Sequence, residues 1–171
     1  MLSLIRIRSG LILLVVVSIF LLSLNTSVPA QSSQPRFNAY PVRSVFKGKN
    51  AAIRLSKEDM NFRTRLRHAA RQKPDFAGEY VLAAWGCGAE CLVGAAVNVR
   101  TGRVYWLPFT ICCWAFGDDV KPIDHRLNSR LTVFSGSRNE SEKDTRDDMH
   151  YYEFQNGRFI FLKTLKRRET N

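Results

Sequence analysis

Four cysteines carry the most distinctive chemistry in this 171-residue chain, and they fall in two groups, WGCGAEC at 85–91 and CCW at 112–114. Cys87 and Cys91 are separated by three residues, Gly88, Ala89 and Glu90, whereas Cys112 and Cys113 are adjacent. Cysteines form disulfides, take part in thiol–disulfide exchange or bind zinc. Each of these uses makes a different demand on the spacing.

A predicted β-hairpin brings the two groups together. Two apolar strands flank a turn at 100–102, and an unbroken antiparallel register pairs Val99 with Val104 next to the turn. The same register places Cys91 opposite Cys112. A bulge in the turn, or the proline in the second strand, would shift these pairs. We expect the cysteine groups to meet at the open end of the hairpin.

The favoured interpretation is two structural disulfides that link the first group to the second, Cys87 and Cys91 to Cys112 and Cys113. A redox-active pair, either Cys87–Cys91 or Cys112–Cys113, is a second interpretation, although the chain has no thioredoxin-like CxxC. A four-cysteine zinc site is a third, but adjacent cysteines crowd tetrahedral ligation. A c-type haem is excluded because no CxxCH occurs.

A second candidate is a basic helix that follows Ser56 and ends before Pro74. Four of its residues could bind an anionic partner: Arg63, Arg65, Arg67 and Arg71. A solvated helix packed on a sheet through Met60, Phe62 and Leu66 is the alternative. The whole basic segment 36–73 could lie against anionic lipid headgroups, cell-wall polymers or an acidic partner protein.

No residues form a recognisable catalytic motif. GxSxG, HExxH, P-loop and GxGxxG patterns are absent. We interpret His68, His125 and His150 as surface histidines. The acidic clusters at 118–119 and 144–148 could bind Ca²⁺, but they lack the EF-hand spacing, so we interpret them as solvated loops. The sequence therefore favours a protein without enzymatic activity, cofactor or metal.

The first thirty residues resemble an export signal. Arg6 and Arg8 precede an apolar run at 10–24, and Val28-Pro29-Ala30 offers a cleavage site after Ala30. An uncleaved anchor is the alternative, but the run is short for a bilayer span, which needs about 20 apolar residues. We therefore expect an exported protein, periplasmic or extracellular, that keeps no membrane span after cleavage. Export favours disulfides and argues against a nucleic-acid partner.

The formal net charge of +11 is unevenly distributed. Residues 36–73 hold eleven basic and two acidic side chains, whereas residues 74–162 hold nine basic and twelve acidic ones. The basic character thus belongs to the N-terminal third of the mature chain and to the tail, outside the main part of the predicted domain.

The predicted architecture is a single α+β domain at 56–171, preceded by a linker or N-terminal extension at 31–55. One basic helix leads into an antiparallel meander of about five to seven strands. The expected strands lie at 79–85, 92–99, 103–111, 131–134, 150–155 and 158–165, with a further short one possible at 43–46.

The last predicted hairpin has the clearest register. Asn156-Gly157 is typical of a two-residue turn. This turn places Phe154 opposite Phe159 and Tyr152 opposite Phe161, so that four aromatic side chains share one face. We expect this face to be ordinary core, because large aromatic side chains are usually buried.

Three segments together resemble a known pattern: Phe76-Ala77-Gly78-Glu79-Tyr80, Trp85-Gly86-Cys87-Gly88 with Cys91, and Thr101-Gly102-Arg103-Val104-Tyr105. They are similar to small exported bacterial proteins of uncharacterised function that carry FxGxY…WGCGxxC…TGxVY, over roughly 74–136. The resemblance implies a small exported β-rich domain and assigns no functional residue.

Our leading hypothesis is an exported, non-enzymatic binding or structural module whose loop end is locked by disulfides. A redox or zinc-dependent protein using Cys87, Cys91, Cys112 and Cys113 is the first alternative. An inhibitor or immunity-like protein that caps another exported protein is the second.

Overall fold

The computed structural model describes residues 34–117 and 120–167. Short helices come first and strands follow. The elements are η1 (Phe37–Ala39), η2 (Glu58–Phe62), α2 (Arg63–Ala69), β1 (Tyr80–Gly88), β2 (Cys91–Asn98), β3 (Val104–Trp106), β4 (Ile111–Cys112), β5 (Ile123–His125), β6 (Leu131–Ser135), β7 (Ser137–Arg138), β8 (Asp148–Gln155) and β9 (Arg158–Lys166). The protein is therefore β-rich, as expected, but its helix is short.

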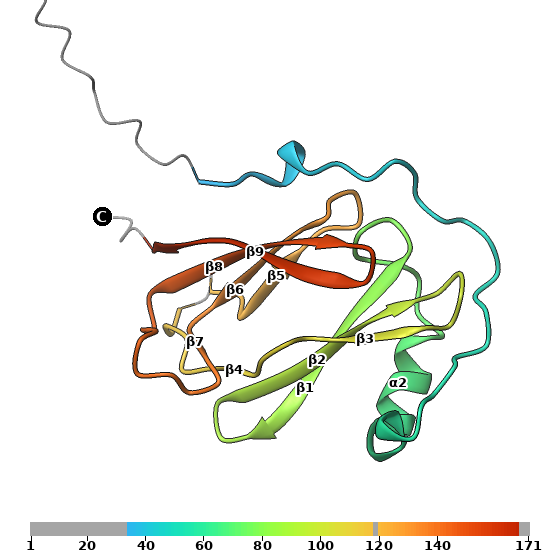
Figure 1. The fold of residues 1–171 in the computed structure, drawn as a ribbon, viewed down its shortest axis with the longest axis horizontal. Coiled ribbons are helices and arrows are strands. Elements are labelled where there is room, and N and C mark those ends of the chain that lie inside the picture. The colour runs from blue at the N-terminus through green and yellow to red at the C-terminus, as the bar shows by residue number, and fades with distance from the viewer. Residues whose placement is uncertain (1–33, 118–119, 168–171) are drawn as a thin grey trace, which may run out of the picture. The chain divides into compact units, whose positions relative to one another are not determined.

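The strands form two antiparallel sheets (Figure 1). The first has the order β1-β2-β4-β7, with β3 also paired to β2, and the second has the order β5-β6-β8-β9. The single meander expected from the sequence is thus too simple. Two short strands, β5 and β7, were not predicted, because runs of two or three residues are too short to show a period of two.

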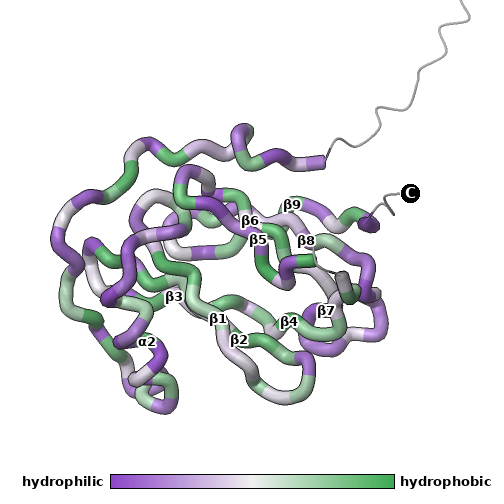
Figure 2. The backbone as a smooth tube through the Cα atoms, turned by 180° about the vertical axis from the view of Figure 1, so that it is seen from behind, coloured by the Kyte–Doolittle hydropathy of each residue, from purple (hydrophilic) through white to green (hydrophobic). Residues whose placement is uncertain are grey.

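The sheets face each other and are covered on their outer sides. Leu66 and Ala69 of α2 pack on the outer face of the first sheet, in a cluster with Trp85. On the outer face of the second sheet, Tyr151 packs near Phe37 from the N-terminal segment. In Figure 2 the hydrophobic colour concentrates on the strands, and much of the hydrophilic colour lies on loops. Both faces of the central strands are therefore buried.

Aromatic side chains fill the space between the sheets. Phe154 and Phe159 pack beside Phe76, whereas Tyr152 and Phe134 pack beside Phe109. The β8–β9 ladder pairs Gln155 with Arg158 around the Asn-Gly turn, and then Phe154 with Phe159 and Tyr152 with Phe161. The register predicted for the last hairpin is confirmed, and Tyr152, Phe154 and Phe159 of its aromatic face pack in the core. The expectation is wrong for Phe161, which is 50% exposed at the edge of this face.

The β2–β3 register differs from the prediction near the turn. Val104 pairs with Val97 instead of Val99, because the chain makes a longer turn with Gly102 in the left-handed region. The ladder breaks at Pro108 and resumes with β4, where Cys112 lies opposite Cys91 as predicted. The longer turn and the later break offset each other, so the far end of the hairpin keeps its expected pairs.

The predicted helix start is confirmed in its capping residue. The Ser56 amide donates to Asp59 Oδ2 at 2.7 Å, and the Asp59 amide donates to Ser56 Oγ at 3.3 Å, a reciprocal pair typical of a capping box. The other oxygen of the buried Asp59 carboxylate accepts a hydrogen bond from Trp106 Nε1 at 2.8 Å. This contact ties the helical segment to β3.

Residues 34–55 lie on the domain and are not a free linker. The amides of Phe46, Ala51 and Arg54 donate to the carbonyls of Gly78, Val99 and Gly102. Ile53 and Leu55 pack against the cluster beneath α2. The strand considered at 43–46 does not form, although the segment is anchored along most of its length.

The predicted signal peptide and its alternative, an uncleaved anchor, fall on residues 1–30, outside the described residues. Within the described residues, no helix has the length and apolar character needed to cross a membrane.

Candidate functional site

The two cysteine groups lie side by side at one end of the first sheet. Cys87 and Cys91 flank the tip of the β1–β2 hairpin, and Cys112 ends β4 opposite Cys91. The disulfides join Cys87 to Cys91 and Cys112 to Cys113, and no cysteine is free. All four cysteines are thus paired, but the expected links across the hairpin are wrong.

The local backbone explains the pairing of Cys87 with Cys91. The β1–β2 ladder shifts register between Gly86 and Gly88, so that Cys87 leaves the regular pairing. Glu90, in the left-handed region at φ +50°, then reverses the chain. The two cysteine Cα atoms are 5.2 Å apart, well within the range for a disulfide. Sequence spacing alone did not reveal this bulge.

Neither disulfide closes a large loop. Chain-entropy theory gives about 2 kcal/mol for a ring the size of Cys87–Cys91 and about 1 kcal/mol for the adjacent pair. A bridge between Cys91 and Cys112 would give about 3.4 kcal/mol by the same reasoning. The observed pairing therefore contributes less to the stability of the fold than the pairing across the hairpin would.

The backbone of Gly136 packs closely against the backbone beside the Cys112–Cys113 disulfide. Gly136, at φ +99°, lies so near that a Cβ there would overlap the Cys112 carbonyl oxygen and come within 2.9 Å of Trp114 Cα. Cys112 is 2% exposed, whereas Cys113 is exposed and has a left-handed backbone at φ +56°. One sulfur-bearing residue of this pair is therefore shielded by the fold and the other faces solvent.

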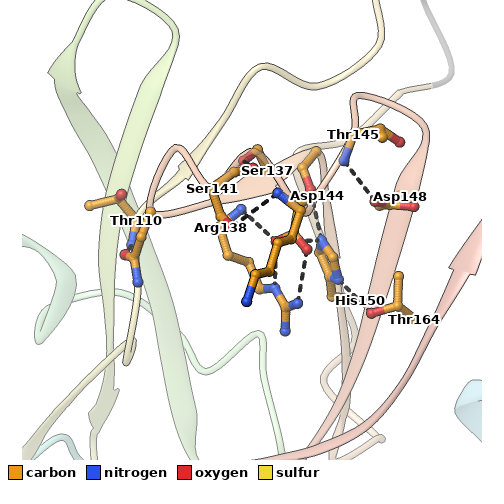
Figure 3. A network of polar contacts seen from close by, with 12 residues as sticks. Thr110, Ser137, Arg138, Ser141, Asp144, Thr145, Asp148, His150 and Thr164 are labelled. Carbon is orange, nitrogen blue, oxygen red and sulfur yellow. Dashed lines mark hydrogen bonds and ion pairs between the residues drawn. The ribbon is translucent and has the colours of Figure 1, made fainter.

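A network of buried polar side chains adjoins Gly136 and includes His150 (Figure 3). His150 is fully buried, and its Nε2 lies 2.7 Å from the Gly136 carbonyl oxygen while its Nδ1 lies 2.8 Å from Thr164 Oγ1. A neutral ring satisfies both contacts if Nε2–H donates to Gly136 and Nδ1 accepts from the hydroxyl. The expectation of a surface histidine at this position is wrong, because His150 belongs to β8 of the second sheet and its ring is enclosed between the Gly136 backbone and Thr164 of β9.

Charged residues complete the network. Arg138 donates to both oxygens of Asp144, from Nε at 2.8 Å and from Nη2 at 3.1 Å, and its Nη1 donates to Tyr152 Oη at 2.8 Å. Lys166 Nζ lies 2.8 Å from Asp148 Oδ1. These contacts tie the loop at 139–147 to both sheets, so the expectation of merely solvated acids is wrong for Asp144 and Asp148.

Three of these side chains offer ligand atoms of the kind that bind metal ions. Ligand atoms of Asp144, Asp148 and His150 all lie within 4.8 Å of one another. However, Arg138 and Lys166 already neutralise the two carboxylates, and both His150 nitrogens have hydrogen-bond partners. The contacts favour a structural network over a metal site.

The pKa values of the network follow from burial and ion pairing. Hydrogen bonds from Arg138 hold the pKa of the Asp144 carboxyl below its ordinary 3.8. Burial alone would raise the pKa of Asp148, but Lys166 and the Thr145 amide more than offset it, and the pKa is lowered. Burial lowers the pKa of His150 below 6.5, since an imidazolium there would lose its water.

The four arginines predicted as binding residues separate into two pairs. Arg67 and Arg71 line one hollow, described below. Arg65 instead lies over the Trp85 ring, 5.9 Å from its centroid, and Arg63 donates to the Met60 carbonyl at 3.2 Å. The helix therefore does not present its arginines as one surface.

A hollow of about 1040 Å³ lies between the segment 45–53 and the residues at the end of α2. Its lining includes five cationic side chains and no carboxylate; the cations are Lys47, Lys49, Arg67, Arg71 and Lys73. We call this hollow the basic groove. Sequence reasoning missed the three lysines as site residues, although the charge count of 36–73 pointed to this region.

None of these five cations forms an ion pair with any residue of 34–117 or 120–167. The lining of the basic groove also includes apolar side chains such as Phe46, Ile53 and Leu127. Asn50 Nδ2 donates to the carbonyls of Ala70 at 2.9 Å and Gln72 at 2.8 Å. These bonds satisfy carbonyl oxygens at the end of the helix that would otherwise face the groove.

His125 makes a separate contact on the second sheet. Its Nε2 lies 3.6 Å from Asp75 Oδ2, and its ring meets Phe76 edge-on, with 5.8 Å between ring centroids. The carboxylate that His125 contacts therefore belongs to Asp75 and not to its chain neighbour Asp124. Like His150, this residue is not a freely exposed side chain.

The fold and the sites define a small β-rich domain of two sheets, with a basic groove and two disulfides that each close a small ring. No protein-family model matches the chain, and neither a curated protein nor a solved structure is similar enough to count as a match.

Proposed function

We propose that the protein is an exported binding module that holds an anionic envelope component in the basic groove. The observation that carries this proposal is the concentration of five cations, none of them ion-paired within the described residues, around one hollow without a carboxylate. Elsewhere in the domain, Arg100, Arg130 and Arg138 each have an acidic partner.

Electrostatics supports an anion as the ligand. Like charges gathered in a concave surface repel one another, and field lines concentrate in such a cavity, so a negative group is attracted there. The carbonyl oxygens of Ala70 and Gln72 carry partial negative charge and would oppose this attraction if they had no hydrogen-bond donor. The Asn50 amide covers both of them.

The apolar residues that line the groove restrict the class of ligand that it suits. Phe46, Ile53 and Leu127 offer contact to non-polar parts of a ligand, while the lysines and arginines hold its phosphate or carboxylate groups. An anionic cell-wall polymer and an anionic lipid headgroup share this chemistry. Export itself rests on the sequence features of the first thirty residues.

The test is binding of soluble inorganic polyphosphate to the full chain, before and after five substitutions in the groove: Lys47→Gln, Lys49→Gln, Arg67→Gln, Arg71→Gln and Lys73→Gln. An exposed ion pair contributes about 0.2–1 kcal/mol. We therefore expect the combined variant to bind roughly tenfold more weakly or worse at low salt. The wild-type affinity should also fall as salt rises, because the contacts are exposed.

The matched control removes five exposed cations outside the groove: Lys57→Gln, Arg63→Gln, Arg65→Gln, Arg103→Gln and Arg158→Gln. Its net charge equals that of the groove variant, and we expect it to keep most of the affinity. An equal loss in both variants would overturn the proposal. Vesicles of phosphatidylglycerol, compared with phosphatidylcholine, show whether a lipid headgroup can supply the anion.

A further inference from the structure

We propose that the two disulfides form a redox relay, a site of thiol–disulfide exchange that accepts an electron pair from an external dithiol and passes it from Cys87–Cys91 to Cys112–Cys113. This inference is independent of the basic groove. It assigns the cysteines a chemical role in thiol–disulfide exchange in place of a purely structural one.

The position of the inner cysteines carries the inference. Cys91 and Cys112 are direct partners in the β2–β4 ladder. Opposite residues in antiparallel strands have Cα atoms about 4.5–5.5 Å apart, and their side chains leave the same face of the sheet. Disulfides span Cα separations of about 4.4–6.8 Å. A bond between Cys91 and Cys112 is thus compatible with the backbone as it stands.

Exposure distinguishes the outer cysteine of each pair, Cys87 and Cys113, from the inner one. Cys87 is exposed at the hairpin tip, Cys91 is half-buried, and Cys112 is 2% exposed. An external thiol can therefore reach Cys87, whereas exchange between Cys91 and Cys112 takes place within the protein. Cys113 is exposed and can leave as a solvated thiolate.

Two features favour a functional role over a structural one. Both disulfides close very small rings, so they restrict the unfolded chain little. Cys113 also has a left-handed backbone, which is unfavourable for a residue other than glycine. Opening the Cys112–Cys113 bond frees this residue to relax, and Gly136 and His150 hold the backbone on the Cys112 side in place.

The first steps consume one molecule of a dithiol. A donor thiolate attacks Cys87 Sγ, the Cys87–Cys91 bond breaks, and Cys91 leaves as a thiolate. The donor's second thiolate then attacks the donor sulfur of this mixed disulfide and releases Cys87. The donor is now a disulfide, having lost two electrons and two protons, and Cys87 and Cys91 have gained them.

The transfer steps need no further reactant. The Cys91 thiolate attacks Cys112 Sγ, which forms a Cys91–Cys112 bond and releases the Cys113 thiolate. The Cys87 thiolate then attacks Cys91 Sγ, which restores Cys87–Cys91 and releases the Cys112 thiolate. The net result is an oxidised donor and a reduced Cys112/Cys113 pair, with two protons taken up by the two thiolates.

The test asks whether the Cys91–Cys112 bond forms in the full chain when the outer cysteine of either pair is replaced. Cys87→Ser leaves Cys91 without its partner, and we expect it to bond to Cys112 and leave Cys113 as the free thiol. Cys113→Ser leaves Cys112 without its partner, and we expect the same Cys91–Cys112 bond with Cys87 free. Alkylation of the monomeric protein followed by non-reducing peptide mapping identifies the bond and the free thiol.

The double variant Cys87→Ser with Cys112→Ser is the matched control, since it removes the inner acceptor and should show no such bond. Circular dichroism identifies any variant that fails to fold, and the other single variant then decides the outcome. An intact Cys112–Cys113 bond in folded Cys87→Ser, or an intact Cys87–Cys91 bond in folded Cys113→Ser, would overturn the relay.

Discussion

At the scale of single residues, His150 determines how the polar network responds to pH. The imidazole is fully buried and joins the Gly136 carbonyl to the Thr164 hydroxyl. Because Gly136 packs directly against the backbone of Cys112 and Trp114, the ring supports one side of the disulfide site. A buried neutral histidine in such a position makes folding sensitive to protonation.

The lowered pKa of His150 predicts a loss of stability on acidification. Well above pH 6.5 the residue is neutral in both states. As the pH falls below that value, the unfolded chain binds a proton that the folded protein resists, so the free energy of unfolding decreases, by at most about 1.4 kcal/mol per pH unit. Urea denaturation between pH 7.5 and 5 measures this slope. The lowered pKa values of Asp144 and Asp148 act separately, because their contributions are lost only below about pH 4.

The variant His150→Gln should show a weaker slope than wild type between pH 7 and 5, because its amide can donate to Gly136 but does not titrate. His68→Gln, on the exposed surface of α2, is the control for removal of any histidine. An unchanged slope in His150→Gln would show that another group causes the pH dependence.

At the scale of elements, turn chemistry decides which strand pairs form. Asn156-Gly157 fixes the β8–β9 register, because both residues adopt positive φ, +50° and +77°. The β2–β3 connection is less regular, and Gly102 approaches the carbonyl of Ala52 from the N-terminal segment. Each turn therefore contacts another segment of the chain in addition to connecting its two strands.

Gly157→Ala should destabilise the protein by about 1–3 kcal/mol, since the new methyl group would overlap the Tyr105 ring and the backbone is left-handed. Gly86→Ala is the control, because the nearest atom to its added Cβ, the Cys91 carbonyl oxygen, is 3.9 Å away. Thermal and urea unfolding compare the two. Equal stabilities would mean that the hairpin tip relaxes freely and does not press on β3.

At the scale of the whole molecule, the N-terminal segment is a layer of the fold. Ser129 Oγ, which is buried, lies 2.8 Å from the Phe37 carbonyl and 3.1 Å from the Tyr40 carbonyl. Further along, Ile53 and Leu55 pack under α2. The segment thus covers the second sheet at one end and forms a wall of the basic groove at the other.

A chain that begins at Ser56 should be several kcal/mol less stable than one that begins at Gln34. It loses at least five hydrogen bonds, each worth about 0.5–1.5 kcal/mol, and the apolar contacts of Ile53 and Leu55. Urea denaturation of the two chains measures the difference. Equal stability would return this segment to the status of a linker.

Local signals in the sequence predicted a substantial part of this arrangement. The Asn-Gly turn gave the register of the last hairpin, Ser56 gave the start of the helical segment, and the spacing of the cysteines placed Cys91 opposite Cys112. These predictions succeeded because each depends on few residues and on one strong geometric preference. The β-rich character followed from the same periodicity.

The sequence by itself determined the composition, the charge concentration at 36–73 and these short-range pairs. Only the tertiary structure decided that strands form two sheets, that each disulfide closes within its own group, and that His150 is buried. The physical reason is range. A bulge of one residue redirects Cys87, and contacts with Gly136 and Thr164, each 14 residues away in the chain, enclose His150. Neither effect leaves a periodic trace in the sequence.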